Sequence, residues 1–225
     1  AEAGVNVGNV RRIETPTGHA VIQVDSAGQN SIVISGGANR SIQVLDRDVA
    51  FALLQPGDWL LLQNEINDIE AVLMEAGDRD VKVAFNVAPV DGREQNYCLD
   101  AVRLLIVNEV EATALARKTV PDAALDALCG RFPTAHIVLT LGREGLLHGI
   151  GGHREKLGAY RVEAVDETAA GDAFVGYLMA GLLSGEEYVK ALLLGSAAGA
   201  LAVTQEGAAS SIPEYADVLA MQDSN

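Results

Sequence analysis

The chain has 225 residues, of which 49% are apolar and 21% charged, and its formal net charge is -15. This balance predicts a soluble globular protein with a sizeable core, and the negative charge disfavours nucleic acid or an anionic membrane as a partner. Cys98 and Cys129 lack the spacing of a metal site or a disulfide framework, and neither a signal peptide nor a membrane-spanning run is recognisable, so we expect a cytoplasmic protein.

The first predicted element is a β-hairpin. Residues 20–24 (AVIQV) and 31–34 (SIVI) are short apolar strands that flank the polar residues 25–30. An ordinary edge hairpin also fits this pattern. Residues 35–39 (SGGAN) follow as a flexible turn, and because no Gly-Lys-Ser/Thr comes after them, they do not form a Walker-type phosphate loop.

From residue 47 onward, apolar strands alternate with helical stretches. We expect strands at 58–63, 81–87, 102–107 and 136–141, and helices at 66–76, 109–116 and 122–129. Apolar strands separated by helices are typical of a parallel sheet that is covered on both faces. The sequence therefore predicts a three-layer α/β/α fold with a mostly parallel sheet.

Polar residues follow the predicted strands, at the sheet edge where α/β proteins bind ligands. Glu65 follows the first strand, Asn108 and Glu111 follow the third, and Thr140 begins the segment TLGREG. Each has a simpler alternative: Glu65 as a solvated carboxylate, Asn108 with Glu111 as a helix cap, and residues 140–145 as a connecting turn.

The most informative stretch is residues 165–172 (VDETAAGD), which leads into the apolar run 173–183. Small residues before a helix leave the first backbone amides uncovered, and such amides bind anions. Asp172 falls in this first turn, either as a partner of the helix dipole or as a group that accepts a proton from an attacking alcohol. A phosphate could approach closely here, so the stretch indicates phosphoryl transfer.

Four segments together resemble the ribokinase branch of the ribokinase-like (PfkB) carbohydrate kinases. They are residues 108–111, 140–145, 166–172 and 202–213, and the resemblance extends over essentially the whole chain. It implies transfer of the γ-phosphoryl group of ATP to the primary hydroxyl of a pentose, first of all ribose. Kinases of fructose, deoxyribose or a nucleoside, and a non-catalytic sugar- or nucleotide-binding relative, are the alternatives.

The resemblance also implies roles for single residues. Asp172 would be the catalytic base and contact the sugar, Glu65 would bind the sugar, and Asn108 with Glu111 would organise Mg²⁺ beside ATP. The amides of Ala169, Ala170, Gly171 and Asp172 would form an anion hole for the transferred group. The nucleotide site would comprise Thr140, Leu141, Gly142, Arg143, Glu144, Gly145, Gly171 and Ser196. A K⁺ site would comprise Asp166, Thr168, Ala202, Gln205, Gly207 and Ser211, several of them through backbone carbonyls.

The chain departs from the family pattern in two respects. Glu167 stands where the family usually has threonine, and its charge lies next to the expected cation site. The first quarter of the family's fold has no counterpart before Ala1. We therefore expect one ribokinase-like α/β domain, incomplete at its N-terminal side, with a lid hairpin at about 17–36 through which the chain forms a homodimer.

Overall fold

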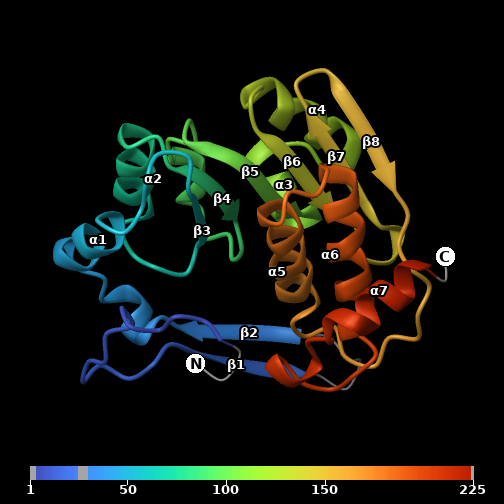
Figure 1. Cartoon of the computed structure of the whole chain (residues 1–225), viewed down its shortest axis with the longest axis horizontal. Helices are drawn as coiled ribbons and strands as arrows, with labels where there is room; N and C mark the ends of the chain where they lie inside the picture. Colours follow the sequence, from blue (N-terminus) through green and yellow to red (C-terminus); the bar gives the residue numbers. More distant parts are fainter. Residues whose placement is uncertain (1–3, 25–29, 224–225) are drawn as a thin grey trace. The chain divides into compact units, whose positions relative to one another are not determined.

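The computed structural model describes residues 4–24 and 30–223, and the chain divides into two compact units, up to residue 105 and from residue 106 onward (Figure 1). Strand β5 (Val102–Asn108) contributes residues to both units. Each unit is described separately below. Every helix in the described ranges is too short or too polar to cross a membrane.

The first unit opens with the predicted hairpin. Strands β1 (His19–Val24) and β2 (Asn30–Ser35) pair antiparallel, with Val21 opposite Val33. Of the predicted tip at 25–30, Asn30 begins β2, and residues 25–29 lie outside the described residues. The following segment is not a flexible turn, because residues 37–40 form a 3-10 helix. The amide of Ala38 donates to the Pro16 carbonyl at 2.8 Å, which fixes this segment against the chain before β1.

The rest of the first unit is an α/β arrangement around two parallel strands. It comprises α1 (Val44–Phe51), β3 (Trp59–Gln63), α2 (Ile69–Asp78), β4 (Lys82–Asn86) and the start of β5. Strands β3 and β4 pair in parallel, with Leu61 opposite Ala84, as expected for strands joined through a helix. Helix α2 begins at Ile69 and not at the predicted Ile66, because Asp68 has a left-handed backbone with φ 58°.

The second unit contains three consecutive strands that pair antiparallel. After β5 come α3 (Glu109–Ala116), α4 (Pro121–Arg131), β6 (His136–Thr140), β7 (Leu146–Ile150) and β8 (His153–Leu157). The strand order is β5-β6-β7-β8, and β6, β7 and β8 pair antiparallel. The sequence pattern predicts β6 but neither β7 nor β8.

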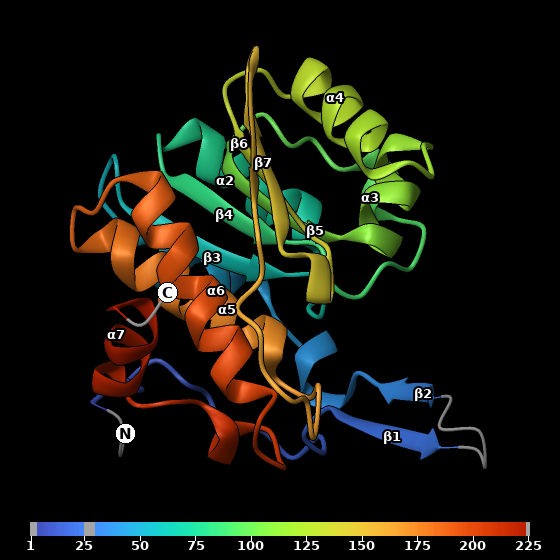
Figure 2. The same cartoon turned by 90° about the vertical axis from the view of Figure 1, so that its right-hand side faces the viewer.

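Three helices complete the second unit: α5 (Ala170–Leu183), α6 (Tyr188–Ala202) and α7 (Tyr215–Asp223). Helices α3 and α4 lie on one side of β6 and β7, and α5 and α6 lie on the other (Figure 2). Large apolar side chains such as Leu128, Ile137, Leu178 and Leu192 are fully buried between these layers. The predicted three-layer α/β/α class is confirmed, and the sheet is mixed.

Candidate functional site

The site is built around the first turn of α5. The preceding residue, Ala169, has a left-handed backbone with φ 60°, and its methyl side chain offers no oxygen to cap the helix. The carbonyl of Ala169 accepts from the Ala173 amide at 2.8 Å, which starts the helical hydrogen bonds. The amides of the first turn therefore present the positive end of the helix dipole to the space before the helix. Asp172 lies in this turn, as predicted.

Close packing against α6 fixes the position of this helix tip. A Cβ atom at Gly195 would lie 2.8 Å from the Phe174 carbonyl oxygen, and one at Gly199 would lie 3.1 Å from the Ala170 carbonyl oxygen. Both glycines thus let α6 approach the first turns of α5 more closely than any residue with a side chain would. The approach also brings Ser196 of α6 beside the tip, on the wall of a cavity.

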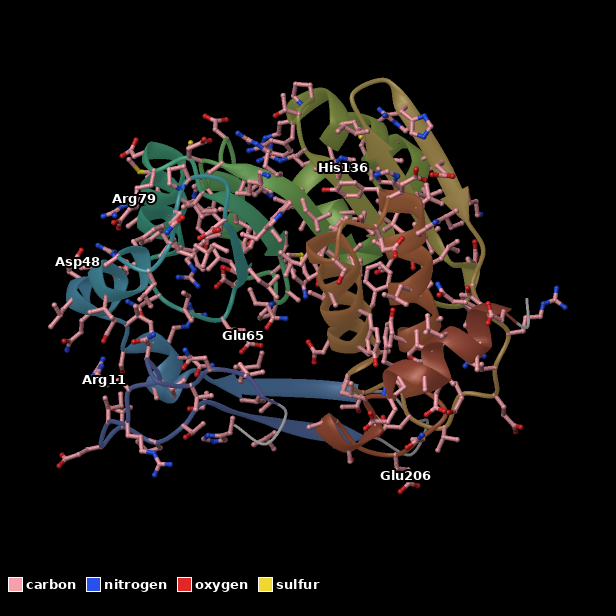
Figure 3. The ribbon with its side chains drawn as sticks, in the orientation of Figure 1. Arg11, Asp48, Glu65, Arg79, His136 and Glu206 are labelled. Carbon is pink, nitrogen blue, oxygen red and sulfur yellow. The ribbon has the colours of Figure 1, made fainter. Side chains whose placement is uncertain are left out.

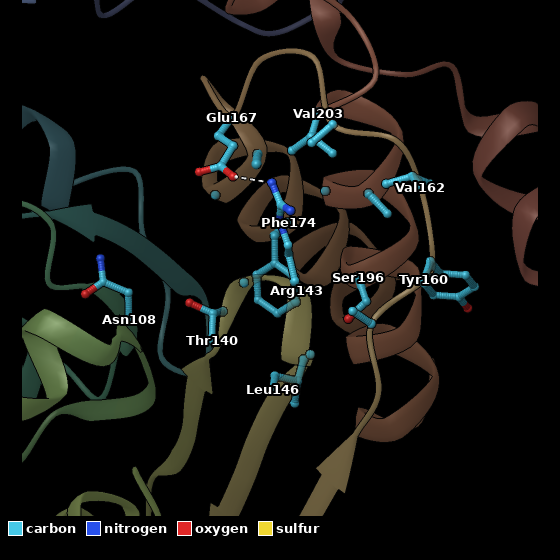
Figure 4. Close-up of a pocket in the computed structure, with 18 of the residues that line it drawn as sticks. Asn108, Thr140, Arg143, Leu146, Tyr160, Val162, Glu167, Phe174, Ser196 and Val203 are labelled. Carbon is cyan, nitrogen blue, oxygen red and sulfur yellow. Dashed lines mark ion pairs between the residues drawn. The ribbon is translucent and has the colours of Figure 1, made fainter. Parts of the chain in front are cut away.

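This cavity has a volume of about 600 Å³ and lies entirely within the second unit (Figure 4). Its size is within the usual range of small-molecule sites. The turn after β6, the segment after β8, the tip of α5 and the face of α6 supply its walls. The lining residues are Asn108, Glu109, Thr140, Gly142, Arg143, Gly145, Leu146, Ala159, Tyr160, Arg161, Val162, Ala164, Glu167, Ala170, Gly171, Phe174, Ser196, Gly199, Ala200 and Val203.

Many residues that were predicted for the nucleotide, the Mg²⁺ ion and the anion hole therefore meet around one cavity. Those present are Asn108, Thr140, Gly142, Arg143, Gly145, Ala170, Gly171 and Ser196, whereas Glu111 does not line it. Leu141 and Glu144 belong to the same turn but do not line the cavity, and Leu141 is buried. Ala169 and Asp172 flank the lining residues of the tip without being among them, and Asp172 is exposed.

The segment 140–145 is both a connecting turn and a cavity wall. It joins the antiparallel strands β6 and β7, and the Leu141 amide donates to the Gly145 carbonyl at 2.8 Å. Gly145 has φ 93°, and a Cβ atom there would lie 2.0 Å from the Leu157 carbonyl oxygen. Only glycine fits this position, because both the backbone angle and the contact exclude a side chain.

Asn108 and Glu111 form the helix cap that the sequence analysis gave as the simpler alternative. The Asn108 side chain accepts from the Glu111 amide at 2.9 Å, and the Glu111 carboxylate accepts from the Asn108 amide at 2.8 Å and from its Nδ2 at 2.9 Å. Burial raises the pKa of Glu111, against the lowering effect of these hydrogen bonds. The cap holds an amide and a carboxylate together beside the cavity, at the start of α3.

Asp166 organises the loop before α5. Its Oδ1 accepts from the amide of Thr168 at 2.9 Å and from its hydroxyl at 2.6 Å, and its Oδ2 accepts from the Gly207 amide at 3.0 Å. These hydrogen bonds lower the pKa of Asp166, and the bond from the Thr168 hydroxyl has the largest effect. The Val165 amide also donates to the Val203 carbonyl at 2.7 Å, so the loop is attached to the end of α6.

The predicted K⁺ ligands are thus brought together in part. Asp166, Thr168 and Gly207 are joined directly by hydrogen bonds. The Ala202 carbonyl accepts from the Gln205 amide at 3.2 Å, directly after α6. Ser211 is fully buried, and its hydroxyl donates to the Ala208 carbonyl at 2.8 Å. The set consists of hard oxygen atoms, which is the ligand type that an alkali cation requires.

The predicted sugar-binding residue Glu65 belongs to the first unit, two residues after the end of β3 (Figure 3). It is exposed, and its Oε2 accepts from Asn39 Nδ2 at 3.4 Å. The neighbouring Asn64 is fully buried, and its polar atoms are satisfied there: its Nδ2 donates to the Pro89 carbonyl at 2.7 Å, and its Oδ1 accepts from the Tyr97 hydroxyl at 2.8 Å. These bonds fix the end of β3 from which Glu65 projects.

Several residues that line the cavity were not predicted from the sequence. Tyr160, Arg161 and Val162 lie in an irregular segment after β8, which carries no periodic pattern from which its position could be read. Gly199 was detectable, because glycines at positions 195 and 199 are four residues apart, on one face of a helix, where a second helix can approach closely.

Comparisons with known proteins identify the family. The family model described as pfkB family carbohydrate kinase matches residues 1–215. The chain belongs to the pfkB family of carbohydrate kinases. It is 31% identical over 226 residues to a ribokinase of Haemophilus influenzae, a match that covers 97% of this chain and 74% of that protein.

Solved structures of this family agree with the fold described above. A ribokinase of Thermotoga maritima is 34% identical, with a TM-score of 0.79 over 95% of this chain and 72% of that one. A ribokinase of Arabidopsis thaliana, solved in complex with ribose and ATP, is 27% identical, with a TM-score of 0.74 over 92% of this chain and 70% of that one. The pfkB-family chain is therefore a phosphotransferase whose acceptor is an alcohol group of a sugar.

Proposed function

We propose that this pfkB-family chain transfers the γ-phosphoryl group of ATP to the primary hydroxyl of ribose. The observation that carries the proposal is the uncapped tip of α5 on the wall of a cavity, in a chain whose relatives are ribokinases. A polyphosphate that enters the cavity would meet the amide of Gly171 and that of Ala170, which donates only a long bond of 3.4 Å to the Glu167 carbonyl. Helix amides at this position stabilise negative charge on the transferred group.

Asp172 is proposed as the base that removes the proton of the sugar hydroxyl. It lies in the same helical turn as the amides that would hold the phosphoryl group, and it is exposed. In-line transfer needs the alcohol and the phosphorus atom held together more than it needs covalent chemistry, so position and electrostatics provide most of the catalysis. Glu65, held beside Asn39 in the first unit, is proposed to bind the sugar.

Two cations are proposed to assist. The capped pair Asn108 and Glu111 offers an amide and a carboxylate that would orient Mg²⁺ and its waters beside the ATP phosphates. Asp166, Thr168 and Gly207, with Ala202, Gln205 and Ser211, would hold K⁺ through hard oxygen atoms. When bound, the two ions would offset the negative charge of the phosphates.

A panel of acceptors tests the proposal. ADP formation from ATP should depend on ribose, and should be slower with fructose, deoxyribose or adenosine at equal concentration. Activity should require Mg²⁺ and should be higher in K⁺ than in Li⁺ at equal ionic strength. Faster turnover with adenosine than with ribose would identify a nucleoside kinase, and nucleotide binding without ADP formation for any acceptor would identify a binding relative.

We also propose a cytoplasmic location and a homodimer formed through the hairpin β1–β2. Both cysteines are free thiols, which suits a reducing compartment. Val21, Val33 and Ile34 of the hairpin are each more than half exposed, and apolar residues on a two-stranded hairpin favour pairing with another surface. Sedimentation of the chain and of Val33→Asp would test the dimer, since a charge in such an interface should release monomers.

A further inference from the structure

An ion pair crosses the rim of the cavity. Arg143 comes from the turn after β6, and Glu167 comes from the loop before α5, so the two side chains belong to different walls (Figure 4). Nη2 of Arg143 lies 3.7 Å from Oε1 of Glu167, and the side chains are 85% and 76% exposed. The pair is therefore long and hydrated, and an exposed contact of this kind is weak.

Glu167 places a negative charge where the proposed function requires an anion to bind. It lines the cavity shortly before the tip of α5. The neighbouring Asp166 is already engaged by Thr168 and Gly207, so Glu167 is the carboxylate of this loop that faces an incoming ligand. A carboxylate near a helix N-terminus both repels a phosphate and competes with it for the positive end of the dipole.

Arg143 is the group that can resolve this conflict. The cavity lining carries two arginines, Arg143 and Arg161, and two glutamates, Glu109 and Glu167, so its charges balance without a ligand. A guanidinium binds phosphate oxygens in a bidentate manner, which is stronger than one contact of 3.7 Å to an exposed carboxylate. A polyphosphate that enters the cavity therefore offers Arg143 a better partner than Glu167.

We propose that the Arg143 guanidinium leaves Glu167 when a nucleoside polyphosphate binds, and that it then pairs with the terminal phosphate of the ligand. This inference rests on the proposed nucleotide site. Because Glu167 repels any phosphate that Arg143 does not hold, the pair favours ligands that can supply this new partner. The exchange of partners by Arg143 thus favours ligands that carry a polyphosphate. It makes no contribution to the binding of the uncharged nucleoside.

A double-mutant cycle on ligand binding tests the exchange. Dissociation constants for ADP and for adenosine would be measured by calorimetry with the unsubstituted chain, Glu167→Gln, Arg143→Met and the double variant. Glu167→Gln removes the competitor and should tighten ADP binding about twofold to fivefold. Arg143→Met removes the phosphate partner and should weaken ADP binding about tenfold. The affinity for adenosine should stay within about twofold in all four proteins.

The double variant distinguishes exchange from simple shielding. If Arg143 only masked the charge of Glu167, Arg143→Met would have no effect once Glu167 is glutamine. If Arg143 exchanges partners, Arg143→Met must still weaken ADP binding in the Glu167→Gln background. The loss must be at least as large as the loss measured when Glu167 is present. The matched control is the exposed pair Lys190 and Glu186, 3.9 Å apart and outside the cavity lining, for which Lys190→Met and Glu186→Gln should leave both affinities unchanged.

Three results would overturn the inference. An unchanged ADP affinity in Arg143→Met means that Arg143 does not reach the phosphates. Equal losses for ADP and adenosine mean that Arg143 only supports the turn. If Arg143→Met no longer weakens ADP binding in the Glu167→Gln background, Arg143 only shields the charge of Glu167. If the unsubstituted chain binds adenosine but not ADP, or neither, the proposed nucleotide site itself is wrong, and this result is separate from those of the variants.

Discussion

Asp172 occupies a position where a carboxylate has an ordinary reason to be. An acid in the first turn of a helix interacts favourably with the helix dipole, and α7 has Asp217 in the corresponding turn. The two aspartates are both exposed. They differ in surroundings, because the tip of α5 lies on the wall of the cavity of about 600 Å³, whereas Asp217 lines a separate pocket between α6 and α7. A comparison of the two aspartates therefore separates stabilisation of the helix through its dipole from a direct role in phosphoryl transfer.

We expect Asp172→Asn to lower kcat for ribose phosphorylation by about a hundredfold or more, because the alcohol loses its proton acceptor. ADP binding should change little. Asp217→Asn should leave kcat unchanged, while both variants should lose a similar stability of about 0.3–1 kcal/mol from the dipole. Steady-state kinetics and urea unfolding measure the two quantities. Equal turnover for Asp172→Asn and the unsubstituted chain would remove Asp172 from the role of base.

His136, which is partly buried, and His148, which is buried, form a pair in β6 and β7 away from the turn 140–145. Nδ1 of His136 lies 2.9 Å from Nε2 of His148, and the His136 ring stacks on Tyr188, the first residue of α6. Burial, together with the charge of His148, lowers the pKa of His136 from 6.5 to about 4. Burial also lowers the pKa of His148, although Glu155 acts in the opposite direction. Both rings are therefore neutral in the folded chain at pH 7.

The pair predicts an acid-dependent loss of stability. Because the folded pKa of His136 lies below the unfolded value, the unfolded chain binds more protons between about pH 6.5 and pH 4, so stability falls as the pH falls through this range. From pH 7 to pH 5.5 the free energy of unfolding should drop by about 1 kcal/mol through His136. His136→Phe keeps a ring on Tyr188 and should reduce this drop. Tyr188→Phe, which keeps the histidine, should retain it; an identical pH dependence in the two variants would contradict the assignment.

The sequence predicts the helices and strands that are marked by a residue pattern within their own segment. Helix α3 (Glu109–Ala116) was predicted with its observed ends, because Asn108 and Glu111 form its cap. Strands β7 and β8 were not predicted, since residues 146–157 mix glycines with charged side chains and their pairing depends on distant partners. The same division holds for the site. Residues 140–145 and 170–171 were found from their motifs, whereas Tyr160 to Val162 reach the cavity only through the path of the chain after β8.

The close contact between α5 and α6 depends on glycine residues, which have no side chain. A Cβ at Gly195 would lie 2.8 Å from the Phe174 carbonyl oxygen, so the backbones would have to separate. In contrast, a Cβ at Gly176, which is exposed within α5, would meet nothing within 4 Å. The two glycines thus form a matched pair, because both lie inside helices and both would gain helix propensity on substitution by alanine.

We expect Gly195→Ala to lower the free energy of unfolding by about 1–3 kcal/mol, since overpacking outweighs the gain in helix propensity. The same change should weaken ADP binding, because Ser196 and the tip of α5 move apart. Gly176→Ala should raise the free energy of unfolding by up to about 1 kcal/mol and leave ADP binding unchanged. Urea unfolding and calorimetry measure both effects. A stabilised Gly195→Ala variant would show that the close approach of the helices does not limit the site.

The net charge of -15 sets the long-range field that any anionic ligand meets. The cavity lining is balanced, with two arginines and two glutamates, so the local charges do not offset that field at a distance. Free ADP therefore approaches against repulsion, and binding depends on contacts made after entry. Salt screens exposed charges beyond about 10 Å at 0.1 M ionic strength, and it should weaken the repulsion more than it weakens those contacts.

We accordingly expect the association rate of Mg²⁺-free ADP to rise about threefold or more as ionic strength increases from about 10 mM to 150 mM. The rise should be smaller for Mg-ADP, whose charge is lower, and absent for adenosine, whose charge is zero. Stopped-flow measurements with a fluorescent ADP derivative provide the association rate of ADP. Competition against this derivative provides the rates of Mg-ADP and adenosine. A fall in the ADP rate with added salt would mean that Arg143 and Arg161 attract the ligand from a distance, in which case their substitution by methionine should reverse the slope.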